Sequence, residues 1–314
     1  MEQKFRWPAY PKNAADFELL MRAIDDVLSI RNLKPFQRPM HVGPLLWEAF
    51  GWGGSVFPPE GLANQQGFEG DVLMAKCIRW YELFYGEQLK SDFAYGFAPV
   101  RLGNALWRAR AFVTYGSVAL FADKNLSNQG LTLGGPGIQA SCNVLCAIDD
   151  LPQGLASRLT EADLREHLDF HVSMHENLQW RDSFPHTELL DMARADHDTS
   201  TADVLGHRYG QARWAAQQSI EKTLKGLLKL AGTPFPTGGP NGHNLKHLGE
   251  LLEQKHGISV APALLSLATC APKVRYGEEL STEQQALGAN HAVLGVLEQL
   301  RASPNTAILL GSVQ

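Results

Sequence analysis

The fold is decided by ARWAAQQSIEKTLKGLLKL at residues 212–230 and by GHNLKHLGELL at residues 242–252. At about 100° per residue, the apolar side chains of the first stretch fall within roughly 120° of arc, which predicts an amphipathic helix with one buried face. The second stretch repeats leucine at helical spacing behind a histidine. A loop rich in Gly and Pro separates the two, so the sequence predicts a pair of helices packed side by side.

Polar side chains lie at the edge of the buried face of the first helix. Gln217 and Glu221 are expected beside the apolar stripe, whereas Lys222 and Lys229 point into water. A buried polar group without a partner costs about 1–3 kcal/mol, so we expect a partner, and His243 at the start of the second helix offers one. Two interpretations stay open: these side chains cross-link two packed helices, or they line a groove for a nucleotide or a base.

The two stretches resemble the helix pair of HEPN domains, which are small helical modules of nucleotide- and RNA-linked proteins. Arg275-Tyr276 stands where that family often carries an Arg-Tyr pair before its last helix. The resemblance covers about residues 200–305, and the part before it resembles no family. The matching residues are Gln217, Gln218, Glu221, Lys222, Leu224, Lys225, Leu227 and Leu228 in the first helix, and His243, Leu245 and Leu248 in the second.

The resemblance implies an up-down bundle of four or five helices that often forms a symmetric dimer. It implies association with a nucleotide, with RNA or with a partner protein, in a stress or defence system. We therefore expect a cytoplasmic homodimer formed through the bundle, with one of these as its partner. The candidate ligand-binding residues are Gln217, Glu221, Lys225, His243, Lys246 and Arg275.

Members of this family that cleave RNA without a metal use an arginine followed, four to six residues later, by a histidine. There the arginine would orient a phosphate and the histidine would help to transfer a proton. Arg275 is followed by YGEELST, which contains no histidine, and a literal match from Arg181 to His186 lies before the long helix. We therefore expect a binding module that is not an active nuclease. A metal-independent ribonuclease with an atypical site is the alternative.

A second alternative comes from His167, His171 and His175, which follow one another four residues apart in REHLDFHVSMHENL. Side chains at this spacing share one face of a helix and can bind a divalent metal. The same face also carries leucines, and the HExxH signature of zinc proteases is absent, so hydrogen-bonded core histidines are the simpler interpretation. We expect no metal and no cofactor, and we keep a metal-dependent hydrolase built on these three histidines as an alternative.

Elsewhere, helical spacing follows a predicted cap at Asn13 and recurs over residues 70–85. The Pro- and Gly-rich residues 34–68 are expected to form an ordered loop. The β signal covers residues 100–121, where residues 107–115 alternate with period two, and it predicts a strand after a hairpin turn at Gly103-Asn104. Further helices are expected at residues 138–149, 161–178, 186–195, 201–231, 243–256, 259–270 and 282–302.

These patterns together predict a mainly α protein, α+β overall, in two domains. Residues 1–198 would form an α+β domain of unknown function with a small antiparallel sheet. Residues 199–305 would form the up-down helical bundle that resembles HEPN, and residues 306–314 a tail. We expect the boundary near residues 196–201, in the polar stretch ADHDTST.

Composition and charge exclude several classes of protein. The net charge is −5, and the part from residue 200 onward carries 10 Lys and Arg against 8 Asp and Glu. Neither part has the strongly basic patch of a protein that tracks a nucleic-acid backbone. No apolar run approaches the ~20 residues that cross a bilayer, and the first residues show no secretory signal, so a cytoplasmic location is expected.

Overall fold

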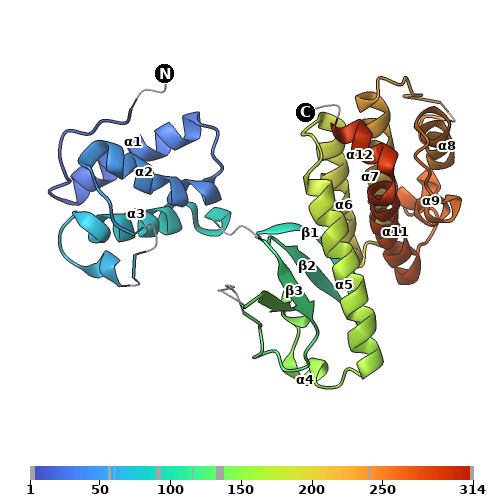
Figure 1. Ribbon diagram of the computed structural model, residues 1–314, viewed down its shortest axis with the longest axis horizontal. Coiled ribbons are helices and arrows are strands. Elements are labelled where there is room, and N and C mark those ends of the chain that lie inside the picture. The colour runs from blue at the N-terminus through green and yellow to red at the C-terminus, as the bar shows by residue number, and fades with distance from the viewer. Residues whose placement is uncertain are drawn as a thin grey trace. The chain divides into compact units, whose positions relative to one another are not determined.

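The computed structural model describes residues 4–55, 58–59, 61–89, 93–114, 116–131, 138–239 and 241–311 (Figure 1). The chain forms two compact units, Met1–Asp92 and Phe93–Gln314, each with its own hydrophobic core. It is mainly α with α+β character, as predicted. Among the described residues, no helix is both long and apolar enough to cross a membrane.

The described part of the first unit is helical. The predicted cap at Asn13 is confirmed, because its side chain accepts a hydrogen bond from the backbone N–H of Asp16 at 2.9 Å. Leu20, Leu45 and Met74, one from each long helix, are fully buried in a common core. The elements are α1 (Ala14–Ile30), η1 (Pro35–Gln37), α2 (Arg38–Phe50), η2 (Leu62–Asn64), α3 (Gly70–Tyr85) and η3 (Gly86–Leu89).

The prediction of a loop at residues 34–68 is wrong over α2, because this segment is a helix despite its internal Pro44. The proline lies on the exposed face of α2, whereas Val42, Leu45 and Leu46 on the other face are fully buried. A proline inside a helix costs about 3 kcal/mol, and burying one aliphatic side chain contributes about 1.5–3 kcal/mol. Burial of the apolar face therefore outweighs the local preference.

The second unit begins with an antiparallel hairpin of β1 (Ala94–Leu102) and β2 (Ala105–Phe112), which confirms the predicted turn and sheet. Leu102 pairs with Ala105 across the turn, where Gly103 has a φ of 60° that favours glycine. Tyr115, the last residue of the predicted alternation, lies outside the described residues.

The helix expected at residues 138–149 is not formed. Its described part contains β4 (Ala140–Asn143), which pairs in parallel with β3 (Val118–Phe121), and the short helical turn η4 (Val144–Ala147). The Asn143 side chain accepts from the N–H groups of Asp123 and Leu145 and donates to the carbonyl of Asn128. These bonds hold the segment against a neighbouring loop, which competes with helix formation.

The remaining elements of the second unit are helices. Long helices α5, α6, α7 and α11 pack side by side, and α5 and α6 also cover the hairpin (Figure 1). α7 is central, because it contacts α6, α8, α9, α10, α11 and α12. The bounds are α4 (Gln153–Ala156), α5 (Glu161–Asp182), α6 (Glu188–Leu205), α7 (Tyr209–Leu230), α8 (Leu245–His256), α9 (Pro262–Ala268), α10 (Pro272–Arg275), α11 (Glu283–Ala302) and α12 (Pro304–Gly311).

The division of the chain differs from the expected one. The predicted split between residues 1–198 and 199–305 would cut through α6, whereas one continuous core runs from Ala98 of β1 to Leu309 of α12. The hairpin and the bundle therefore belong to the same unit. The tail expected at residues 306–314 also differs, because α12 continues to Gly311, and the last three residues lie outside the described part.

The polar stretch at residues 196–201 explains why the sequence suggested a boundary there. Three of its polar residues, His197, Ser200 and Thr201, are buried inside the unit. His197 Nδ1 accepts from Arg181 at 3.0 Å, and Ser200 accepts from Asn290 at 3.0 Å. Polar composition indicates a linker only when the polar groups face water. Here they form a hydrogen-bonded network between α5, α6 and α11.

Candidate functional site

A polar cluster surrounds the buried carboxylate of Glu221 on α7. Lys225, one turn later, donates to it at 2.7 Å, and both side chains are less than a tenth exposed. His243, just before α8, directs Nδ1 at both carboxylate oxygens, at 3.1 and 3.2 Å, and the Gln218 amide donates at 3.3 Å. A carboxylate only accepts hydrogen bonds, so Nδ1 of His243 carries a proton. The cluster joins α7 to the start of α8.

Gln217 is also buried, but it has a different partner. Its Oε1 accepts the backbone N–H of Cys270 at 2.7 Å, which ties α7 to the segment after α9. The sequence grouped this side chain with Glu221 and His243, and the helical spacing does put it on the same face as Glu221. The partners differ because successive turns of α7 are covered by different elements.

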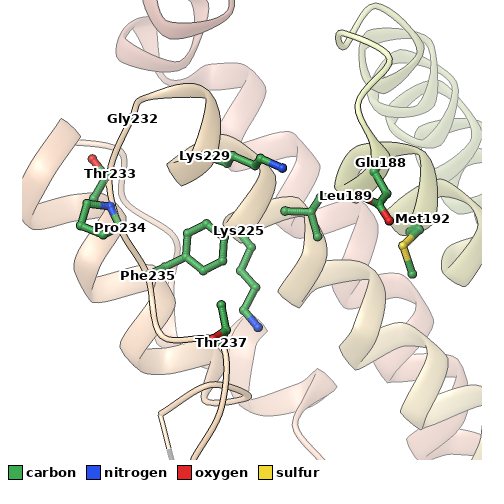
Figure 2. A pocket seen from close by; sticks show the side chains of 10 residues that line it. All are labelled: Glu188, Leu189, Met192, Lys225, Lys229, Gly232, Thr233, Pro234, Phe235 and Thr237. Atoms are coloured by element: carbon green, nitrogen blue, oxygen red, sulfur yellow. The ribbon is translucent and has the colours of Figure 1, made fainter.

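A pocket of about 680 Å³ has Lys225, the ion-pair partner of Glu221, in its wall (Figure 2). Lys225 and Lys229 line it from α7, and Phe235 lines it from the loop that follows. The first turns of α6 form the opposite wall with Glu188 and Met192. The Phe235 ring lies beside Lys225, whose Nζ is 6.0 Å from the ring centroid. The pocket thus combines an aromatic surface with amines.

The two lysines of the pocket differ in charge balance. Lys225 is neutralised by Glu221, whereas Lys229 is exposed and has no hydrogen-bond or ion-pair partner within the described ranges. Glu188, in the first turn of α6, is the carboxylate that faces the pocket. A ligand therefore meets an unpaired ammonium on one wall and a carboxylate on the other. The sequence correctly predicted that Lys229 is exposed, but it gave no signal for Phe235 or Glu188.

Two candidate residues lie elsewhere. Lys246 is exposed on α8, where it pairs with Glu250 at 3.8 Å. Arg275 ends α10 and places its guanidinium 5.5 Å from the ring centroid of Trp214, in the first turns of α7. In the part of the chain that the structure describes, neither Lys246 nor Arg275 forms a hydrogen bond or ion pair with Glu221. The structure therefore brings together Glu221, Lys225 and His243 of the predicted set.

Lys222 does not point into water, contrary to the expectation. It pairs with Asp196 of α6, and its side chain is only 16% exposed. The amphipathic pattern of a helix predicts which face meets solvent only when the helix packs against a neighbour on one side. Several helices cover α7, so the face opposite the leucines is also largely enclosed.

Arg181 and His186, which match the arginine–histidine spacing of the nucleases, have different surroundings and different partners. Arg181 is 5% exposed and donates to His197 and to the carbonyl of Tyr95, at 3.0 and 2.9 Å. His186 is exposed and lies 3.1 Å from Asp191. Burial lowers the pKa of Arg181 to about 10, so the guanidinium stays charged inside the core. It is enclosed and cannot reach the phosphate of an RNA.

The histidine row on α5 is buried against β2. His175 donates from Nε2 to the carbonyl of Phe112 at 2.9 Å, and the rings of His167 and His171 lie 5.8 Å apart. Burial lowers the pKa of His167 to about 4 and that of His171 to about 3, so both are neutral at pH 7. Among the described residues, no group of three or more His, Cys, Asp or Glu side chains could hold a metal ion.

Comparison with protein-family models, with curated proteins and with solved structures found no match for the chain. The HEPN resemblance thus rests on the residues of α7 and α8 and on the Arg275-Tyr276 pair. What the second unit can bind follows from the geometry of its pocket.

Proposed function

We propose that the second unit is a HEPN-like cytoplasmic binding module that takes a nucleotide, or the phosphorylated end of an RNA, in the pocket beside the Glu221 cluster. One observation carries the proposal. Lys229 presents an unpaired ammonium in a pocket that also exposes the ring of Phe235. A phosphate accepts charge-assisted hydrogen bonds from an ammonium, and a base stacks on an aromatic ring. A pocket of about 680 Å³ is of a size that binds small ligands.

The Glu221 cluster gives this pocket a fixed wall. Glu221 holds Lys225 at 2.7 Å, and the ordered lysine stem lies beside the Phe235 ring. A wall that is ordered before binding lowers the entropy cost of binding. In this proposal Glu221 and His243 position the wall, and Lys229 and Phe235 contact the ligand. We propose a binding module rather than a nuclease, and the enclosure of Arg181, which is bonded to His197, supports this choice.

The test is calorimetric titration of the full chain with AMP, adenosine and inorganic phosphate in buffer that contains EDTA. We expect AMP to bind more tightly than either of its two parts. Lys229→Gln removes an attractive charge and should weaken the binding of AMP about tenfold. Glu188→Gln removes a repulsive charge and should strengthen the binding of AMP. Lys255→Gln, an exposed lysine on α8 outside the pocket, is the matched control.

Equal affinities for AMP and adenosine, or no binding of AMP, would overturn the proposal. A 5′-phosphorylated oligoribonucleotide tests the RNA form of the ligand in the same assay. Recovery of that oligonucleotide intact after incubation supports a binding module, whereas cleavage in EDTA would support the ribonuclease alternative.

A further inference from the structure

A second pocket of about 380 Å³ lies in the same unit, at the other end of the hairpin and helices. It is formed by the end of β1, the first turns of α5 and the first half of α11. None of its residues lines the nucleotide pocket. The polar and aromatic side chains around it are Arg101, Asp163, Glu166, His167, Phe170 and His291.

The charge of this pocket is negative. Asp163 accepts from the backbone N–H and the hydroxyl of Thr160, and the backbone bond is the main reason why the pKa of Asp163 is lowered. Glu166 lies one turn further along α5, is exposed, and has no hydrogen-bond or ion-pair partner in the described part of the chain. The cation at the pocket, Arg101, is already paired with Glu283. The pocket therefore offers carboxylates and no unpaired cation.

The wall between α5 and α11 is aromatic. The Phe170 and His291 rings lie with their centroids 4.8 Å apart. His291 Nε2 donates to the carbonyl of Pro99 at 2.7 Å, which leaves Nδ1 as an acceptor on a neutral ring. The face of an aromatic ring attracts a cation. Such a wall suits the apolar part of a ligand whose charge is positive.

His167 also lies in the wall of the pocket. Its side chain lines the pocket and is 3% exposed, and neither ring nitrogen has a hydrogen-bond partner of good geometry among the described residues. Burial lowers the pKa of this histidine to about 4, so the part of the wall that it forms carries no positive charge at pH 7. A neutral wall does not oppose the binding of a cation.

We propose that this pocket binds a small organic cation, an amine that carries an aromatic or apolar body. The ammonium group lies between Asp163 and Glu166, and the apolar body lies on Phe170 and His291. Two carboxylates beside an aromatic wall select a cation over a neutral or anionic ligand of the same shape. This site is separate from the nucleotide pocket and does not depend on it.

The experiment is calorimetric titration of the full chain with tryptamine, tryptophol and indole-3-acetate. These probes share one ring and carry a positive, a neutral and a negative group. We expect tryptamine to bind at least about tenfold more tightly than tryptophol, and we expect no binding of indole-3-acetate. Similar affinities for all three, tighter binding of the anion, or no binding of tryptamine at millimolar concentration would overturn the proposal.

Matched variants locate the site on α5. Glu166→Gln removes one carboxylate from an exposed position and should weaken tryptamine about tenfold while leaving tryptophol unchanged. Asp169→Asn removes an exposed carboxylate from the same helix outside the pocket and should leave both unchanged. Equal effects of the two variants would assign the binding to general charge attraction and would overturn the site.

Discussion

Lys225 Nζ lies 2.7 Å from Glu221 Oε1, one turn away on the central helix α7, and both side chains are less than a tenth exposed. The pair is held in place by His243 and Gln218, which donate to the same carboxylate. An ion pair this enclosed is costly to break, because the remaining charge has no water to solvate it. The stability of the bundle and the shape of the pocket wall therefore depend on the same two side chains.

Glu221→Gln should lower the free energy of unfolding by about 3–5 kcal/mol, because it leaves the ammonium of Lys225 buried without a counter-ion. Glu250→Gln is the matched control, since its lysine partner Lys246 is also four residues away but 70% exposed. That change should stay within about 0.5 kcal/mol. Urea unfolding at pH 7 measures both. The double variant Glu221→Leu/Lys225→Met should recover most of the loss, and a double variant as unstable as Glu221→Gln would contradict this account.

Because several histidines are buried in the neutral form, we expect the stability of the folded protein to decrease at acidic pH. Burial lowers the pKa of His167 to about 4 and of His171 to about 3, and it also lowers the pKa values of His175, His197 and His291. The unfolded chain takes up these protons near pH 6.5, so the stability from neutral histidines is complete above that pH. For His167 and His171 it is lost as the pH falls toward 4, by about 1.4 kcal/mol per pH unit for each of the two.

His171→Phe tests this prediction directly. Neither ring nitrogen of His171 has a hydrogen-bond partner in the described residues, and the ring packs near Phe112, so an apolar ring removes no bond. Urea midpoints measured between pH 7 and pH 5 should show a smaller decrease than in the parent protein. His186→Phe, at a side chain that is 81% exposed, should leave the decrease unchanged. An identical pH dependence in all three proteins would refute the assignment.

Gly226 lets α6 and α7 approach closely. A Cβ at this position would lie 2.6 Å from Cδ2 of Leu190 on α6. Gly226→Ala should therefore destabilise the protein by about 1–3 kcal/mol through overpacking. Gly288→Ala in α11 has open space around the new methyl group and should stabilise by about 0.5–1 kcal/mol, because alanine favours the helix. Thermal unfolding of both variants is the measurement, and shifts of the same sign would contradict the packing argument.

The proposed homodimer through the bundle has a candidate surface at the segment after α10. Tyr276 and Leu280 are 71% and 91% exposed there, which is unusual for large apolar side chains that lie close together in sequence. Leu280→Asp should convert a dimer into a monomer in light scattering coupled to size exclusion. Leu83→Asp, at a similarly exposed leucine of the first unit, is the control. A parent protein that is monomeric at all concentrations would refute the dimer.

The site was only partly predictable from the sequence. Helical spacing put Glu221 and Lys225 one turn apart, and a histidine at the start of the next helix was a plausible partner, because local geometry fixes those relationships. Phe235, Glu188 and Lys229 meet in one pocket because the loop after α7 and the start of α6 fold over the same turn of helix. Nothing in the local pattern of those residues indicates that contact.

By itself the sequence determined the elements whose signals are local: the cap at Asn13, the hairpin at Gly103, and the amphipathic helix at residues 212–230. Tertiary structure decided where the units divide and which polar groups face water. A polar stretch in α6 became part of the core because Asn290 and Arg181 supply its hydrogen bonds. Periodicity reports the faces of one helix, whereas burial depends on how many neighbours cover it, and those neighbours come from distant parts of the chain.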